Sequence, residues 1–186
     1  MIGIASLWSA ILLAAVIVFV VSSIIHMAPL WHRHDYRPLA RESEVLAALR
    51  PFALAPGDYL LPFCPDMKQM KTPEFQEKLR AGPVAMLRVQ PNGPFGMGKP
   101  LALWFVYCVL VGVFAAYIAS RTLPPGTAYP RVFQIVGATA FMGYALALLQ
   151  NSIWKHRSWG NTLKGCCDGL IYAALTAGTF GWLWPR

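Results

Sequence analysis

All four histidines of this chain lie in short polar stretches beside long apolar segments. Asp35 directly follows one of them, so imidazole and carboxylate groups, which are both common ligands of transition metals, occur together. If residues 32–35 are extended, His32 and His34 project to the same side of the chain. We therefore interpret five residues as a candidate transition-metal site: His26, His32, His34, Asp35 and His156.

A second interpretation of the same residues needs no metal. Polar side chains collect at the ends of membrane segments because they are costly in the apolar core of a bilayer. No C-x-x-C or H-E-x-x-H spacing supports a zinc site. A haem is disfavoured as cofactor, because neither His26 nor His156 lies well inside an apolar segment. The cofactor is therefore left open, with a transition metal as the candidate.

The remaining polar groups predict no catalytic residue. Cys64 lies near two methionines, but methionine is also a common packing residue. Asp168 lies in the first turn of the last predicted helix, where a carboxylate would favour the helix dipole. No G-x-S-x-G turn or other nucleophile with a base is present. These observations favour a protein that is not an enzyme.

Four apolar segments must position these groups. Residues 4–27, 100–120 and 132–154 contain no Lys, Arg, Asp or Glu, and residues 166–185 are nearly as apolar. A bilayer core of about 30 Å requires about 20 apolar residues in a helix. With 56% hydrophobic and 13% charged residues, the sequence predicts an all-α membrane protein. We expect one polytopic domain over residues 1–186, with four transmembrane helices and an uncleaved first span.

Residues 28–99 form an insertion between the first two predicted spans. A short amphipathic helix is expected over residues 42–50, and a second helix begins at Thr72 as N-cap with Pro73 at its first position. Residues 59–63 and 84–89 are apolar runs that can pair as strands. The sequence thus predicts a partly ordered α/β insertion, which is too small and proline-rich to fold well alone.

The distribution of basic residues predicts the topology. Residues 28–99 carry ten Lys and Arg and residues 155–164 carry three, whereas the opposite side has three in total. The positive-inside rule then places the insertion in the cytoplasm and both termini in the periplasm of a bacterial inner membrane. Acidic residues are interleaved with the basic ones in the insertion, so no nucleic-acid partner is expected.

Small residues recur at four-residue spacing in the predicted helices. Such positions allow helix backbones to approach closely in lipid, either within one chain or against another subunit. The residues concerned are Gly112, Ala116, Gly143, Ala147 and Gly178.

Together these features favour a small, non-catalytic accessory, assembly or stabilising subunit of a larger membrane complex. An energy-converting complex is a natural host, and the expected partners are the lipid bilayer and other membrane subunits. The alternative is a metal-handling membrane protein or oxidoreductase that uses the histidines and Asp35. A transporter is disfavoured, because no charged residue lies within the first three segments.

Overall fold

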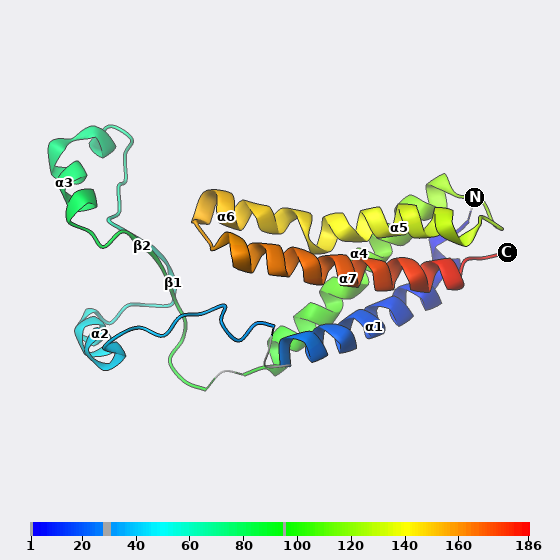
Figure 1. Ribbon diagram of the computed structural model, residues 1–186, viewed down its shortest axis with the longest axis horizontal. Helices are drawn as coiled ribbons and strands as arrows, with labels where there is room; N and C mark the ends of the chain where they lie inside the picture. The colour runs from blue at the N-terminus through cyan, green and yellow to red at the C-terminus, as the bar shows by residue number, and fades with distance from the viewer. Residues whose placement is uncertain (1, 28–30, 95) are drawn as a thin grey trace. The chain divides into compact units, whose positions relative to one another are not determined.

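The computed structural model describes residues 2–27, 31–94 and 96–186 and forms two compact units (Figure 1). The first, which we call the helical bundle, comprises Met1–Tyr36 and Gly96–Arg186. The second, the 37–95 unit, comprises Arg37–Phe95. The chain is mostly helical, as the sequence predicts, with one small sheet.

The long helices of the bundle pack in a ring. α1 contacts α4 and α7, and α5 contacts the same two helices from the other side. The long helices α1, α4, α5 and α7 run in alternating directions, and α6 continues in the direction of α5 (Figure 1). Their bounds are α1 Trp8–Met27, α4 Gly98–Thr122, α5 Tyr129–Tyr144, α6 Leu149–Lys155 and α7 Trp159–Trp182.

Three helical segments are long and apolar enough to cross a membrane: Ile4–Met27, Gly98–Thr122 and Tyr129–Lys155. These are the helices of a membrane protein. α7 has 24 residues and is as long as the others, but its charged and hydroxyl side chains lower its hydropathy. Three of the four predicted spans are thus present as long apolar helices, and the fourth, which corresponds to α7, stays a prediction.

The start of α7 differs from the prediction. The sequence suggests a helix from residue 166, whereas the structure begins it at Trp159. Polar residues are accommodated in the first part of α7 because they find partners: Ser152 Oγ donates a hydrogen bond of 2.7 Å to Thr162 Oγ1. Asp168 consequently lies well beyond the first turn of α7, and the predicted role of its charge at the helix N-terminus is wrong.

The interior of the bundle contains many small residues beside larger ones such as Phe180, while many other large apolar residues point outward. Ala14, Ala115 and Ala177 are at most 2% exposed. The outer side of α1 presents a row of large side chains at four-residue spacing: Leu12, Val16, Val20 and Ile24, each 44% exposed or more. A protein in water buries such side chains, so this outer surface suits lipid.

Most of the predicted small packing residues lie against other helices of the same chain. A Cβ atom at Gly112 or Gly143 would approach a neighbouring side chain to 3.2 or 3.1 Å, and Ala116 is fully buried. The neighbouring residue is Ile11 at Gly112 and Val111 at Gly143. At Gly178 it is Tyr129. These residues thus allow close packing within the bundle.

The third apolar segment is interrupted. α5 ends at Tyr144, and a 3-10 turn over Leu146–Leu148 leads into α6. The predicted packing residue Ala147 lies in this turn and is exposed. Gly169 of α7 lies at the break, where a Cβ atom would come within 2.7 Å of Ala145 Cβ. The absence of a side chain at Gly169 therefore lets α7 lie directly on the break.

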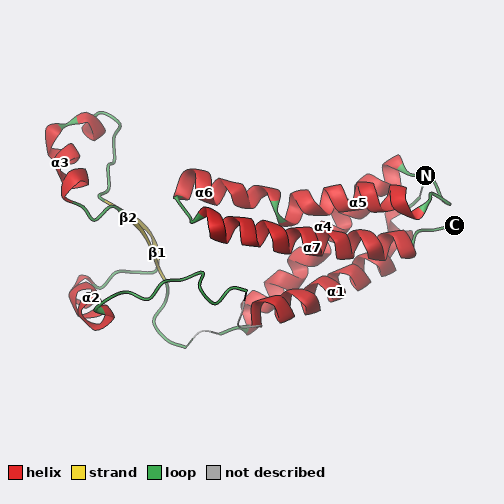
Figure 2. Cartoon of the chain, in the orientation of Figure 1, coloured by secondary structure: helices red, strands yellow, loops and turns green. Residues whose placement is uncertain are grey.

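The 37–95 unit contains the predicted helices and strands (Figure 2). Thr72 caps α3, because its Oγ1 accepts a hydrogen bond of 3.3 Å from the backbone N–H of Phe75. The two strands pair antiparallel, with Leu60 opposite Met86. The bounds are α2 Glu42–Leu49, β1 Gly57–Leu61, α3 Pro73–Ala81 and β2 Ala85–Val89.

The 37–95 unit has no core of its own. Each of residues 37–94 is exposed or only half-buried. Large apolar side chains are among the exposed ones, including Phe52 at 69% and Phe63 at 70%. An isolated two-stranded sheet is at best marginally stable in water, so the elements of this unit are held mainly by local turns and caps.

Candidate functional site

His32 lies between two carboxylates in the helical bundle. Its Nδ1 is 2.7 Å from Asp35 Oδ2, and its Nε2 is 3.1 Å from Asp168 Oδ2. The side chains of Asp35 and Asp168 are only 9% and 5% exposed. A buried carboxylate is costly unless it is paired, so His32 is the group that makes this pair of acids tolerable.

One face of α7 holds the segment that carries His32. Asn161 Nδ2 donates a hydrogen bond of 2.7 Å to the backbone carbonyl of Asp35, and Lys164 Nζ donates to Asp35 Oδ1 at 3.0 Å. Trp31 Nε1 donates to Asp168 Oδ1 at 2.9 Å. Residues 161, 164 and 168 share one helix face by their spacing, which fixes the short segment after α1 against α7.

The acidity of Asp35 reflects this environment. Burial alone would raise the pKa of its carboxyl, because it disfavours the charged form. The hydrogen bonds and positive charges of His32 and Lys164 outweigh burial and hold the pKa of Asp35 below its ordinary value. Asp35 is therefore a stable anion beside the Nδ1 of His32.

His26 joins the site from the end of α1. Its ring stacks on that of His32, with centroids 4.5 Å apart and an interplanar angle of 12°. Its Nδ1 is 2.9 Å from the backbone carbonyl oxygen of Ser22, one turn earlier. One ligand atom each from His26, His32 and Asp168 lies within 4.8 Å of the other two. We call these three residues the His–Asp cluster.

The His–Asp cluster is suited to two kinds of chemistry. A protonated His32 would donate to both carboxylates and act as an ionic clamp between α7 and the segment after α1. A neutral His32 would instead direct the lone pair of Nε2 toward a cation shared with Asp168 and His26. Imidazole nitrogen with carboxylate oxygen is a ligand set for divalent transition metals.

The predicted site residues are only partly brought together. His26, His32 and Asp35 meet, but the side chains of His34 and His156 are exposed and form no hydrogen bond or ion pair with a described residue. Residues 32–35 are not extended: the N–H of Asp35 donates to the carbonyl of His32 at 3.1 Å. This turn brings Asp35 back to His32 and leaves His34 outside the cluster.

Asp168 is the member of the cluster that sequence reasoning missed. It was assigned to a helix start, and a helix start gives a carboxylate a sufficient role of its own. The signal that could have found it is the spacing of Asn161, Lys164 and Asp168, which marks a polar face if the helix begins before residue 161.

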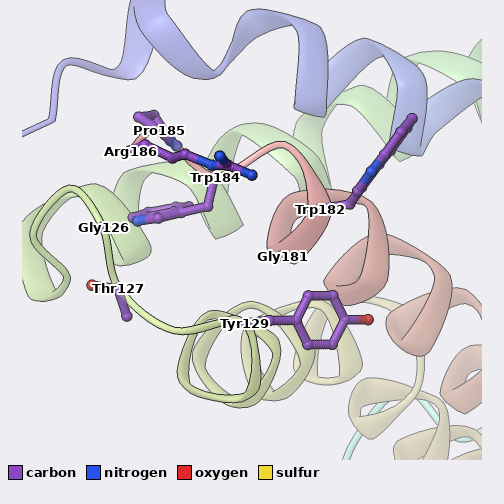
Figure 3. A pocket seen from close by; sticks show the side chains of 8 residues that line it. All are labelled: Gly126, Thr127, Tyr129, Gly181, Trp182, Trp184, Pro185 and Arg186. Carbon is purple, nitrogen blue, oxygen red and sulfur yellow. The ribbon is translucent and has the colours of Figure 1, made fainter.

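A pocket of about 450 Å³ lies between the C-terminal end of α7 and the start of α5 (Figure 3). Tyr129 and Arg186 are its only ionisable side chains. Trp184 Nε1 donates to the carbonyl of Pro124 at 3.1 Å, which fixes the tail beside the α4–α5 loop. The lining residues are Gly126, Thr127, Tyr129, Gly181, Trp182, Trp184, Pro185 and Arg186. This pocket is lined largely by aromatic side chains, and no His, Cys, Asp or Glu is among its lining residues.

Two properties distinguish the His–Asp cluster. Within the described part of the chain, it is the one group of three His, Cys, Asp or Glu residues whose ligand atoms come this close together. Its central members, His32 and Asp168, are also largely shielded from solvent. Comparison with known proteins finds no matching family model, no similar curated protein and no similar solved structure.

Proposed function

We propose that this chain is a non-catalytic accessory, assembly or stabilising subunit of a larger membrane complex, and that the 37–95 unit is the part that contacts another subunit. The observation that carries the proposal is the absence of any buried side chain among residues 37–94. Ordering a chain costs about 1–2 kcal/mol per residue. A unit that buries so little of its own surface gains that energy by packing on a partner.

The exposed surface of the 37–95 unit has the composition of a protein interface. Leu60 and Met86 are opposite each other on the sheet and are 44% and 56% exposed. The ion pair between Asp58 and Arg88 lies beside them on the same strands. An apolar centre with a charged rim is typical of protein–protein interfaces, and the mixture of charges disfavours nucleic acid.

The proposal includes a membrane topology with four spans, in which α7 is the fourth transmembrane helix. The polar residues Thr162, Asp168 and Thr176 of α7 are buried, whereas Leu170 and Ile171 are exposed. Polar groups within a span face the interior of a bundle. The positive-inside rule favours a cytoplasmic 28–99 segment, periplasmic termini and a bacterial inner membrane.

Thiol labelling tests this topology. Cys64 lies in the 37–95 unit, and a membrane-impermeant maleimide added to intact spheroplasts is expected to leave it unlabelled. An Ala128→Cys variant, at an exposed position of the loop between α4 and α5, serves as the control that should react from outside. Efficient labelling at Cys64 and none at the Ala128→Cys position would invert the topology.

Native mass spectrometry tests the subunit proposal. The chain is expressed in its own host at native level, solubilised gently, and its assembly mass is measured. We expect a hetero-assembly that is lost when the apolar pair is changed to Leu60→Lys with Met86→Lys. The matched control adds the same charge at two exposed polar positions, Gln90→Lys with Asn92→Lys, and should retain the assembly. A wild-type chain that is found alone, or only with copies of itself, contradicts the proposal.

Metal handling is a second candidate function, because His26, His32 and Asp168 place three ligand atoms together. It concerns the helical bundle and not the 37–95 unit. The same mass measurement therefore separates the two candidates: bound metal on a solitary chain would favour this second function.

A further inference from the structure

We propose that His26, His32 and Asp168 bind one divalent transition-metal ion, with Asp35 as the positioning residue behind His32. The inference does not depend on the accessory-subunit proposal, because the cluster belongs entirely to the helical bundle. A metal site would be a property of the chain whether or not the 37–95 unit binds a partner.

The hydrogen bonds made by Nδ1 of the two imidazoles leave Nε2 as the remaining nitrogen on each ring, and Nε2 of His32 faces Asp168 Oδ2 at 3.1 Å. The backbone carbonyl of Ser22 can only accept a hydrogen bond, so the contact of 2.9 Å places a proton on Nδ1 of His26. The ionised carboxylate of Asp35 does the same for Nδ1 of His32 at 2.7 Å. In their neutral forms, both rings therefore present the lone pair of Nε2.

The groups around the cluster orient its ligands. A metal-binding histidine almost always donates its other N–H to a carboxylate or a carbonyl, and Asp35 and Ser22 supply these two partners. Trp31 Nε1 donates a hydrogen bond of 2.9 Å to Oδ1 of Asp168, and the other carboxylate oxygen, Oδ2, faces His32. Lys164 holds Asp35 in turn at 3.0 Å. The second layer of such a site is therefore already in place.

The ligand set selects the class of metal. Two imidazole nitrogens and one carboxylate oxygen suit borderline divalent ions such as Zn²⁺, Co²⁺ or Fe²⁺, whereas Ca²⁺ prefers oxygen alone and Cu⁺ prefers sulfur. The 3.1 Å between His32 Nε2 and Asp168 Oδ2 is compatible with two ligands that each bind one ion at about 2.1 Å. The exposed ring of His26 must turn toward them, and the remaining position is open to water.

A proton and a metal ion would compete for Nε2 of His32. Asp35 and Asp168 face His32, and Lys164 and the ring of His26 also lie against this group of charges. A proton on Nε2 of His32 would complete the ionic clamp and block coordination.

Cobalt titration tests the site. The full chain is purified without a polyhistidine tag, stripped with EDTA, returned to nanodiscs and titrated with Co²⁺, whose visible absorption reports nitrogen and oxygen coordination. We expect one equivalent of Co²⁺, which Zn²⁺ displaces. His26→Ala should weaken binding at least about tenfold. Because His26 is exposed, and its ring contacts within the described residues are a backbone carbonyl at hydrogen-bond distance and the stacked ring of His32, this variant should keep the fold.

The other variants distinguish a ligand from a positioning residue and from a bystander. Asp35→Asn should weaken binding about 10–100-fold while the cobalt spectrum keeps its shape, because no ligand is lost. His34→Ala and His156→Ala are matched controls and should bind as the wild type does. Absence of a cobalt spectrum in the wild type, or binding that survives His26→Ala with His32→Ala, would overturn the site in favour of an ionic clamp.

Discussion

The helical bundle and the 37–95 unit both expose large apolar side chains, but only the bundle has a core behind them. In the bundle, small side chains such as Ala115 and Ala177 are buried while Leu12 and Ile24 face outward. In the 37–95 unit, Phe52 and Phe63 are exposed and nothing is buried among residues 37–94. An exposed apolar surface on a closed core suits lipid, whereas the same surface without a core is the observation from which we propose a protein partner.

The two regions also use charge differently. In the bundle, His32 joins two acids that are at most 9% exposed. In the 37–95 unit, the pair between Asp58 and Arg88 has side chains that are 73% and 69% exposed. Exposed ion pairs are screened by water and contribute little, whereas breaking a buried one leaves an uncompensated charge. Charge thus contributes to the fold of one region and not to that of the other.

The largest expected difference comes from removing one aromatic ring in each region. Phe180 is fully buried in the bundle, and Phe180→Ala should lower the free energy of unfolding by about 3–5 kcal/mol through the cavity it leaves. Phe63→Ala in the 37–95 unit should change it by less than about 0.5 kcal/mol. Unfolding of the isolated chain in detergent measures the change in free energy for both variants. A comparable loss for Phe63→Ala would contradict the conclusion that the 37–95 unit has no core.

A smaller effect is expected from adding atoms where two helices meet. Gly169→Val should destabilise the bundle by about 1–3 kcal/mol, because its Cβ would collide with Ala145 in the adjacent helix break. Gly178→Ala is the control, since its Cβ would lie 3.5 Å from Tyr129, an ordinary contact. Thermal unfolding followed by circular dichroism compares the two. Equal tolerance would mean that α7 does not need its close approach to the break.

Lowering the pH should destabilise the bundle because Asp35 becomes protonated. Because its pKa is lower in the folded chain than its ordinary value of 3.8, its contribution is complete above about pH 4 and is lost as the pH falls through the lowered pKa. The wild type should therefore lose more stability between pH 5 and pH 3 than Asp35→Asn does. Melting temperatures over this range provide the measurement, and parallel curves for the two proteins would contradict the assignment.

The smallest effect is expected in the exposed ion pair. Arg88→Gln removes the partner of Asp58 but leaves both positions in water. We expect no measurable change in the melting temperature of the isolated chain, with or without added salt. A clear loss of stability would show that charge contributes to the fold of the 37–95 unit after all.

Local signals in the sequence predicted local structure well. Charge-free segments predicted the apolar helices, and Thr72 with Pro73 predicted the start of α3 because both residues act within one turn. The paired strands followed from apolar runs bounded by turn residues. Such features depend on neighbours in the chain, so they can be derived without knowing what packs against them.

The features that failed depend on distant residues. The early start of α7 requires Asn161 and Lys164 to find partners at residues 31–35. The turn that separates His34 from His32, and the break at Ala145 against Gly169, also arise from packing between segments far apart in sequence. Of the five residues predicted as a site, His26, His32 and Asp35 therefore lie together, but the buried carboxylate of Asp168 was not predicted among them.

The polarity of α7 has a consequence for biogenesis in the proposed four-span topology. An aspartate at the centre of a lone membrane helix costs about 2.5–3.5 kcal/mol at the translocon, and Asp168 finds its partners, Trp31 and His32, beside α1. α7 is also synthesised after α1. Its partitioning into the bilayer should therefore be assisted by helices that have already left the ribosome, which makes retention of α1 near the translocon a condition for correct insertion of the C-terminal helix.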